Sequence, residues 1–242
     1  MKPAISRAMK RLAQRLTGKN KMTRAPAIHR KGFGLKEHIE DDLAQKYHSH
    51  TLAYLLSHGN ELHLGDLHIF LANKFGFCYG VERATEYAYE TLQHFAGRKI
   101  YLLGEIVHNP YVNNQLRQKG VVILNGLQQK QMDYSFIRPQ DVVILPAFGV
   151  THTALNRLQQ RKCEIVDTTC GSVLTVWKRV EYYAQNGFTT IIHGKYPHEE
   201  TIAVCSQISK YPAAKYLVIK NATEGMSIAD FIGGNISKKE IL

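Results

Sequence analysis

This 242-residue sequence has few cysteines and no long apolar run. Its first 31 residues contain no acidic side chain. No run of about 18 apolar residues occurs, so no membrane-spanning segment is expected. The four cysteines stand at positions 78, 163, 170 and 205. So few cysteines in a chain of this length do not indicate a disulfide scaffold, and a reducing compartment such as the cytoplasm is expected.

The first 31 residues hold ten Lys and Arg residues and no Asp or Glu. The whole chain has a net charge of +11, so residues 32–242 are close to neutral. The basicity therefore belongs to the tail, and the near-neutral body argues against nucleic-acid binding. An Arg-rich, acid-free N-terminus is also typical of a transit peptide, which would place the protein in an organelle stroma. A solvated extension is the other interpretation.

Residues 32–66 are expected to form a helical extension, with one helix over residues 39–56. Its polar face carries His48 and His50, which indicate a solvated face rather than a metal site. From residue 67 onward, short apolar runs alternate with amphipathic segments, without a strict repeat or a low-complexity segment. The expected strands are residues 67–72, 100–103, 121–124, 142–147, 163–166, 189–193 and 216–219, and the expected helices are residues 79–95, 110–119, 151–161, 172–185 and 198–209.

Apolar strands that are separated by helices are typical of parallel sheets covered on both faces. We therefore expect an α/β fold, with a first lobe over residues 67–170 and a second lobe over residues 171–242. Residues 221–242 predict no further unit, so the second lobe is expected to have a ragged end.

In open parallel sheets, ligands bind beyond the carboxyl ends of the strands. Both Cys78 and Cys170 are expected there, each opening a helix whose N–H groups favour the thiolate that iron–sulfur clusters and reactive cysteine sites use. His108, His198 and Glu200 also follow expected strands. Imidazoles and a carboxyl at helix starts can bind phosphate and deliver a proton.

Each of these segments also has a plainer interpretation. Cys78 could be a packed cysteine in a tight turn, Cys170 could belong to a capping loop, and residues 198–200 could be an ordinary acidic first turn. Cys163 and Cys205 lie on apolar faces and are expected in the core.

Together these segments resemble the family of 4-hydroxy-3-methylbut-2-enyl diphosphate reductase, the terminal enzyme of the methylerythritol phosphate route to isoprenoids. The similarity covers residues 30–220, and residues 30–34 (RKGFG) resemble the branch of the family with a longer N-terminus. The matching motifs are residues 76–83 (GFCYGVER), 105–109 (EIVHN), 145–149 (LPAFG), 167–170 (DTTC) and 194–201 (GKYPHEET).

The resemblance implies a trefoil-like reductase of three parallel-sheet α/β lobes around a [4Fe-4S] cluster held by three cysteines. It implies reductive dehydroxylation of an allylic diphosphate to isopentenyl and dimethylallyl diphosphates, with electrons from a donor such as ferredoxin or flavodoxin. Cys78 and Cys170 would be the metal ligands. His108 and His198 would bind the diphosphate, and Glu200 would be the catalytic proton donor to the leaving hydroxyl.

Two departures from the family pattern bear on these roles. Many members carry a His where this chain has Phe148, although the branch with a longer N-terminus resembles this chain. The family's third cluster cysteine lies in its third lobe, beyond residue 242. The resemblance therefore implies two of the three lobes, a cluster without its third cysteine, and no turnover unless a separate third lobe is supplied. A non-catalytic remnant, or a module that binds small phosphorylated ligands, is the alternative.

Overall fold

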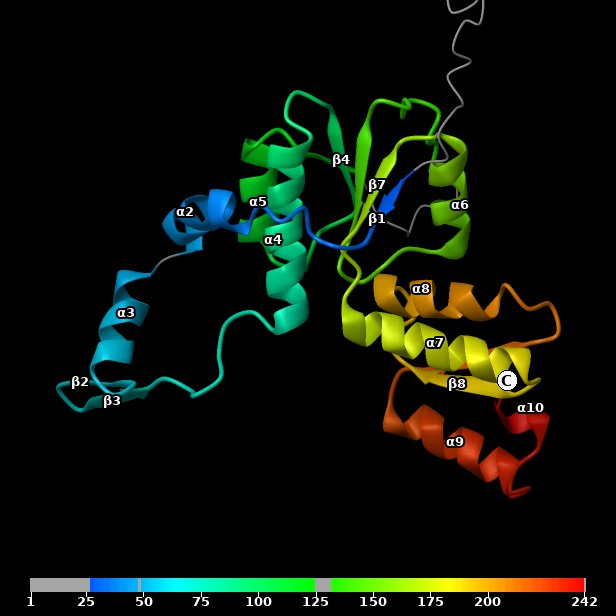
Figure 1. Ribbon diagram of the computed structural model, residues 1–242. Coiled ribbons are helices and arrows are strands. Elements are labelled where there is room, and N and C mark those ends of the chain that lie inside the picture. The colour runs from blue at the N-terminus through cyan, green and yellow to red at the C-terminus, as the bar shows by residue number, and fades with distance from the viewer. Residues whose placement is uncertain (1–26, 48, 125–131, 242) are drawn as a thin grey trace, which may run out of the picture.

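A five-stranded parallel sheet forms the centre of the N-terminal unit in the computed structural model, which describes residues 27–47, 49–124 and 132–241 (Figure 1). The two strands in and next to its middle are buried at every residue, which explains why their sequences are continuous apolar runs. In order across the sheet, the strands are β1 (Ile28–His29), β7 (Glu164–Asp167), β6 (Val142–Leu145), β4 (Ile100–Leu103) and β5 (Val122–Leu124).

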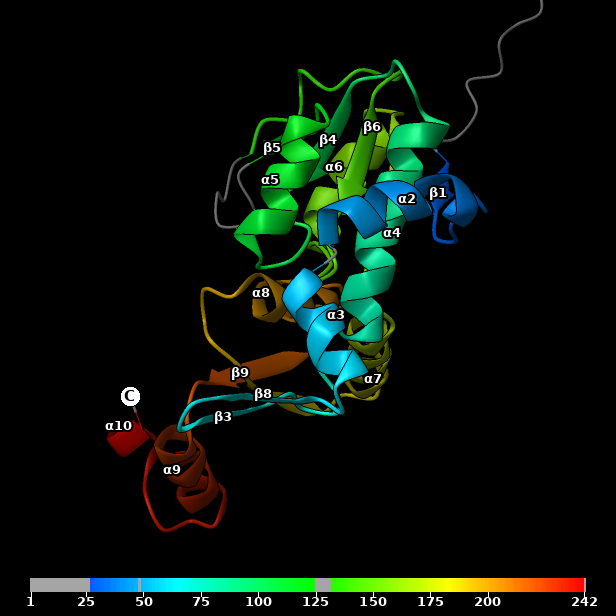
Figure 2. The same cartoon turned by 90° about the vertical axis from the view of Figure 1, so that its left-hand side faces the viewer.

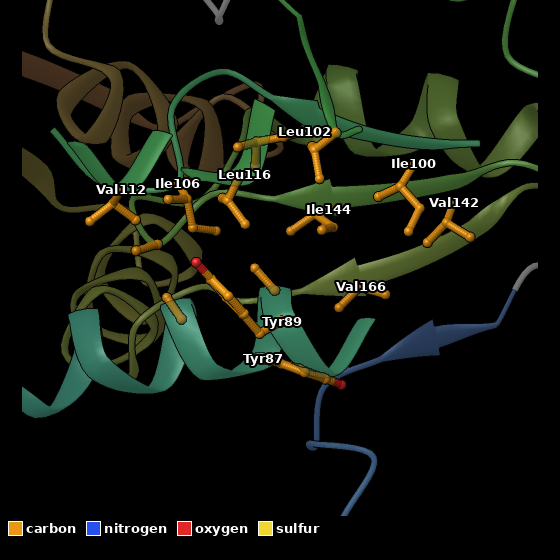
Figure 3. Packing of buried hydrophobic residues seen from close by; sticks show 14 of the residues in the cluster. Tyr87, Tyr89, Ile100, Leu102, Ile106, Val112, Leu116, Val142, Ile144 and Val166 are labelled. Atoms are coloured by element: carbon orange, nitrogen blue, oxygen red, sulfur yellow. The ribbon is translucent and has the colours of Figure 1, made fainter. Parts of the chain in front are cut away.

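Helices cover both faces of this sheet, with α4 (Tyr79–His94) and α5 (Pro110–Gln118) on one face and α6 (His152–Gln160) on the other (Figures 1 and 2). Successive side chains of a strand point to opposite faces. Ile144 therefore packs toward α4 and α5, as Figure 3 shows, whereas its neighbour Leu145 packs on the side of α6. Truncating the fully buried Ile144 to Ala would cost about 2–5 kcal/mol.

A second, smaller unit contains two parallel strands, β8 (Thr189–His193) and β9 (Lys215–Ile219). The helices α7 (Gly171–Gln185) and α8 (Glu199–Ile208) pack against each other through a small core that includes Val180, Val204 and Ile208. In Figure 1, α9 (Ala222–Ile232) lies on the other side of these strands, followed by α10 (Lys238–Ile241). The predicted α/β class is confirmed.

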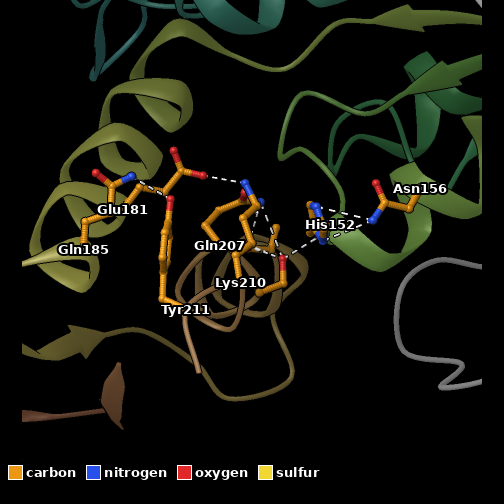
Figure 4. Close-up of polar contacts among 9 residues, drawn as sticks. His152, Asn156, Glu181, Gln185, Gln207, Lys210 and Tyr211 are labelled. Atoms are coloured by element: carbon orange, nitrogen blue, oxygen red, sulfur yellow. Dashed lines mark hydrogen bonds and ion pairs between the residues drawn. The ribbon is translucent and has the colours of Figure 1, made fainter. Parts of the chain in front are cut away.

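Polar contacts join the two units where α6 faces α8 and α7 (Figure 4). The backbone N–H of His152, the first residue of α6, donates to Oγ of Ser206 on α8 at 3.1 Å. Lys210, just after α8, forms an ion pair with Glu181 of α7. The first contact joins α6 to the second half of α8, and the ion pair joins the end of α8 to α7 within the smaller unit.

A β-hairpin replaces the parallel strand that was predicted over residues 67–72. β2 (Glu61–Leu64) pairs antiparallel with β3 (Leu67–Phe70), and neither strand belongs to the five-stranded sheet. The cause is the two-residue turn Gly65–Asp66, in which Gly65 has φ +58°, a conformation that glycine adopts readily and that two-residue hairpin loops require.

The edge of the main sheet is instead formed by β1, whose Ile28 pairs with Ile165. This short strand falls within the segment that was predicted to be a basic N-terminal tail. The division of the chain at residues 31, 66 and 170 stays a prediction, although the sheet contains residues from before the expected start of the first lobe.

The helical extension is two helices rather than the predicted single one, α2 (Lys36–Tyr47) and α3 (His50–Ser57). Ser49 starts the second helix, because its side chain accepts a hydrogen bond from the backbone N–H of Leu52. His48 lies outside the described residues.

The segment after residue 221, for which no helix was predicted, contains the helix α9. Asn221 caps this helix by accepting from the backbone N–H of Glu224 at 2.9 Å. None of the helices in the described ranges is long and apolar enough to cross a membrane.

Candidate functional site

Two cysteines lie together at the carboxyl end of the main sheet. Cys78 is the N-cap of α4 and Cys170 is the N-cap of α7, as predicted. A Cβ atom added to Gly80 would overlap Sγ of Cys170 and would lie 3.9 Å from Sγ of Cys78. Both sulfur atoms therefore border one small space, which stays open because residue 80 has no side chain.

The loop after β7 holds Cys170 in place through its polar neighbours. Asp167 accepts hydrogen bonds from the backbone N–H of Thr169 at 3.1 Å and from its hydroxyl at 2.5 Å. The hydroxyl of Thr168 donates to the carbonyl of Leu145 at 2.6 Å. All three residues of this loop are buried, so the DTTC motif is a rigid connection that ends in a thiol.

Cys78 reaches the same place by a different route from the one predicted. It does not follow a strand of the parallel sheet but a segment that leaves the β2–β3 hairpin and turns at Gly76, which has φ +84°. The ring of Phe77 lies edge-on to Tyr47 of α2, with ring centroids 6.0 Å apart. The packing of α4 on the sheet then places its first residue beside α7.

Three rings from three different loops meet near this edge. His108 stacks on Phe148 with ring centroids 4.3 Å apart and an interplanar angle of 21°. The ring of His198 stands edge-on to both, 5.1 Å from His108 and 5.6 Å from Phe148. The structure therefore brings together the two imidazoles that the sequence singled out, and Phe148 orients them.

The loop that carries His108 is fixed from within the core. The buried amide of Asn113 accepts from the backbone N–H of Ile106 at 3.1 Å and donates to the carbonyl of Val107 at 2.9 Å. At the ring itself, Nδ1 of His108 lies 3.1 Å from a carboxylate oxygen of Glu105. This bond makes Nδ1 the donor and directs Nε2 away from Glu105.

His198 and the two glutamates that follow it form the start of α8. The imidazole Nδ1 of His198 accepts from the backbone N–H of Glu200 at 3.3 Å and so caps the helix. Glu200 and Glu199 are both half-buried. Burial raises the pKa of Glu199, the nearby His108 opposes this shift, and Glu105 adds to it.

One segment of the chain, which follows β6, contacts both Cys170 and the imidazoles. The carbonyl of Ala147 accepts from the backbone N–H of Cys170 at 2.9 Å, and the next residue is Phe148. Gly149 then takes φ +76°, and a Cβ there would overlap the ring of Trp177, so this turn requires glycine. The segment after β6 thus links the thiols to the rings.

The other two cysteines are core residues, as predicted. Cys163 is fully buried, and burial raises the pKa of its thiol to about 11. Cys205 is buried on α8, and burial raises its pKa as well. Thiols in such surroundings are poor ligands and nucleophiles.

Sequence reasoning missed three contributors to this region. Gly80 lies in the segment that was predicted to be a helix over residues 79–95, and its missing side chain makes room for the sulfurs. Glu105 stands three residues before His108, a spacing that could have indicated the contact. Nothing in the sequence distinguishes Glu199 from an ordinary acid in a first turn.

The residues present fit part of a metal–sulfur site. Two thiols that border one open space are the donor type that iron–sulfur clusters use. No group of three or more His, Cys, Asp or Glu side chains that could hold a metal ion occurs within residues 27–47, 49–124 and 132–241. The described residues would therefore supply two ligands of such a site, and its remaining ligands would come from elsewhere.

The fold and the site define a parallel α/β protein that gathers thiols and imidazoles at the carboxyl ends of its strands. Residues 69–235 match the family model described as LytB protein. The chain belongs to this family, which confirms the resemblance found in the sequence.

Its relatives carry the same reductase name. The chain is 43% identical over 206 residues to 4-hydroxy-3-methylbut-2-enyl diphosphate reductase of Gloeobacter violaceus, covering 84% of this chain and 48% of that protein. It is 45% identical over 207 residues to the same enzyme of Thermosynechococcus vestitus, covering 84% and 49%. The chain thus spans about half the length of the curated relatives it matches.

Solved structures agree with this assignment. One is (E)-4-hydroxy-3-methyl-but-2-enyl diphosphate reductase, the terminal enzyme of the non-mevalonate pathway, with TM-score 0.52 and 27% identity over 62% of this chain and 50% of that one. Another is the E-1-hydroxy-2-methyl-but-2-enyl-4-diphosphate reductase of Plasmodium falciparum, with TM-score 0.55 and 26% identity over 62% and 44%.

Proposed function

We propose that this chain forms part of a 4-hydroxy-3-methylbut-2-enyl diphosphate reductase. The observation that carries the proposal is the pair of thiols around Gly80, joined through residues 147–148 to the two imidazoles. The reaction replaces an allylic C–O bond with a C–H bond. It consumes two electrons and two protons, releases water, and gives isopentenyl and dimethylallyl diphosphates.

Cys78 and Cys170 would hold two corners of a [4Fe-4S] cluster. When bound, such a cluster supplies electrons and a Lewis-acidic iron. The two thiols lie at the N-caps of α4 and α7, where the positive ends of both helix dipoles would reduce the cost of gathering negative charge. A one-electron donor such as ferredoxin or flavodoxin would deliver the electrons, and a reducing compartment such as the cytoplasm would keep the thiols free.

His108 and His198 would bind the diphosphate. Their ring centroids are 5.1 Å apart, so both imidazoles would contact one diphosphate. Nε2 of His108 faces away from Glu105, and it donates to an anionic oxygen when the ring is an imidazolium, because the neutral ring keeps its one N–H at Nδ1 for Glu105. Backbone N–H groups at the start of α8 would add donors for the same anion.

Glu200 would donate the proton that the leaving hydroxyl needs. It lies two residues after His198 in the first turn of α8, so one helix start would present both the diphosphate ligand and the acid. A positioned carboxyl of this kind typically contributes a factor of about 10²–10⁴ to the rate.

Anaerobic reconstitution with iron and sulfide tests this function. We expect the wild-type chain to acquire the absorbance of an iron–sulfur cluster, and Cys78→Ser and Cys170→Ser each to lose bound iron. Cys163→Ser is the matched control, because its thiol is buried in the core and should not affect iron content.

The opposite pattern would overturn the assignment. If both single variants of the N-cap cysteines kept full iron while Cys163→Ser lost it, these residues would not be the ligands. If the wild type bound inorganic pyrophosphate but never iron, a module for phosphorylated ligands would be the better description.

A further inference from the structure

Glu199 has a buried oxygen that no described group satisfies. It is the first residue of α8, directly after His198. Its Oε2 atom is fully buried and has no hydrogen-bond partner among the described residues. A buried acceptor without a partner costs about 1–3 kcal/mol. Such a position is stable if the oxygen carries a proton or if a ligand or water completes its bonding.

The surroundings of Glu199 make its charge sensitive to what binds at the histidines. His108 and Glu105 face it from the loop before α5, and His198 and Glu200 flank it at the start of its own helix. An imidazolium at His108 favours the ionised carboxylate, whereas burial and Glu105 favour the neutral acid. These influences oppose one another, so an additional charge can decide the protonation state.

We propose that Glu199 takes up a proton when an anion binds against His108 and His198, so that anion binding at this site is coupled to protonation of this carboxyl. The inference rests on the proposed function, because it uses the same diphosphate site. The ion that binds is a diphosphate or a similar multivalent phosphate anion.

The physical reason is repulsion inside a partly buried space. A diphosphate bound to the imidazoles neutralises the positive charge that would otherwise stabilise the Glu199 carboxylate. The diphosphate also places its own negative charge beside this carboxylate. Protonation removes this repulsion and turns one of the two carboxyl oxygens into a hydrogen-bond donor. The proton comes from solvent, and no bond other than O–H is formed.

Inorganic pyrophosphate is the probe, and calorimetry measures the linkage. Titrations in two buffers with different ionisation enthalpies, repeated from about pH 5 to about pH 8 around the ordinary carboxyl and imidazole ranges, give the number of protons taken up. We expect wild type to take up protons on binding, and Glu199→Gln to take up fewer. At the upper end of this range, Glu199→Gln should bind pyrophosphate about threefold to tenfold more tightly, since a like charge has been removed.

Asp230→Asn is the matched control, because it removes one carboxylate from the exposed surface of α9. It should leave proton uptake and affinity unchanged. Equal proton uptake and equal affinity in wild type and Glu199→Gln would overturn the inference, and so would failure of pyrophosphate to bind at any pH. Either result is independent of iron reconstitution, which tests the thiols.

A direct measurement keeps the proposal testable if Glu199→Gln does not fold. Carboxyl-carbon NMR of the wild type, with Glu199 assigned, should show its pKa moving upward when pyrophosphate is added. An unchanged titration curve in saturating pyrophosphate would sink the proposal without any variant.

Discussion

The substitution Gly80→Ala tests the arrangement of the two thiols most sharply. The added Cβ would approach Sγ of Cys170 more closely than real Cβ atoms do and would lie 3.2 Å from its Cβ. Sγ is the end of a side chain with one rotatable bond. The least costly response is therefore rotation of this thiol away from Cys78, while both helices stay in place.

The expected change in stability is small because two effects oppose each other. Alanine in place of glycine in a helix gains up to about 1 kcal/mol. Forcing a side chain off its preferred rotamer costs about 0.5–1.5 kcal/mol. The free energy of unfolding of Gly80→Ala should therefore lie within about 1 kcal/mol of wild type in urea denaturation. The geometry of the thiol pair, by contrast, should be lost.

Two assays report that loss. Iron content after anaerobic reconstitution should fall strongly, and a trivalent arsenical, which binds two neighbouring thiolates, should form less adduct by mass spectrometry. Gly171→Ala is the matched control, since a Cβ on that glycine meets nothing within 4 Å although it lies next to Cys170. In a Cys170→Ala background, Gly80→Ala should stabilise the chain, because the obstructing sulfur is gone.

The result that refutes this reasoning is simple to recognise. If Gly80→Ala and Gly171→Ala retained the same iron and the same arsenical adduct, the two sulfurs would not share the space over Gly80.

Three further outcomes are expected. Stability should fall as pH rises between about 9 and about 11, because the buried Cys163 keeps its proton up to a pKa of about 11 while the unfolded chain releases it earlier. Cys163→Ala should flatten that part of the denaturation profile, by on the order of 2 kcal/mol, and an unchanged slope would contradict this. Phe148→Ala should weaken pyrophosphate binding about threefold to tenfold in calorimetry, because the ring stacked on His108 is lost; unaltered affinity would show that the ring has no orienting role. Asn113→Ala should destabilise the chain by about 2–4 kcal/mol in urea, since two buried backbone groups lose their partner; the exposed Asn114→Ala serves as control, and equal stability of the two variants would be the contrary result.

Much of the sheet could be predicted because each of its inner strands is buried on both faces. Residues 100–103 and 142–147 were predicted as strands between helical segments, and the structure has β4 and β6 there, with β6 ending at Leu145. The hairpin was missed because residues 67–70 are as apolar as a buried strand. The glycine turn at Gly65 pairs them with β2 outside the main sheet instead, and this turn could be read from the sequence.

The sheet topology determines which loops meet at the candidate site, and this part of the site could be predicted from the sequence. Parallel strands end at one edge, so residues that follow them, such as His108 and Cys170, had to come close together. What could not be predicted is the packing between segments far apart in the chain. The stacking of Phe148 on His108 and the burial of Glu199 both depend on how α8 approaches the main sheet.

The site is built across a junction between two separately packed units, which has a physical consequence. His108 and Phe148 belong to the five-stranded unit, whereas His198 and Glu199 belong to the unit of β8 and β9. Their spacing also depends on contacts that touch none of them, such as the hydrogen bond from His152 to Ser206. Because each unit has its own core, a ligand that binds all of these groups at once also favours one relative position of the two units. Ligand binding at the imidazoles therefore stabilises one relative position of the two units, because any ligand stabilises the conformation that it binds.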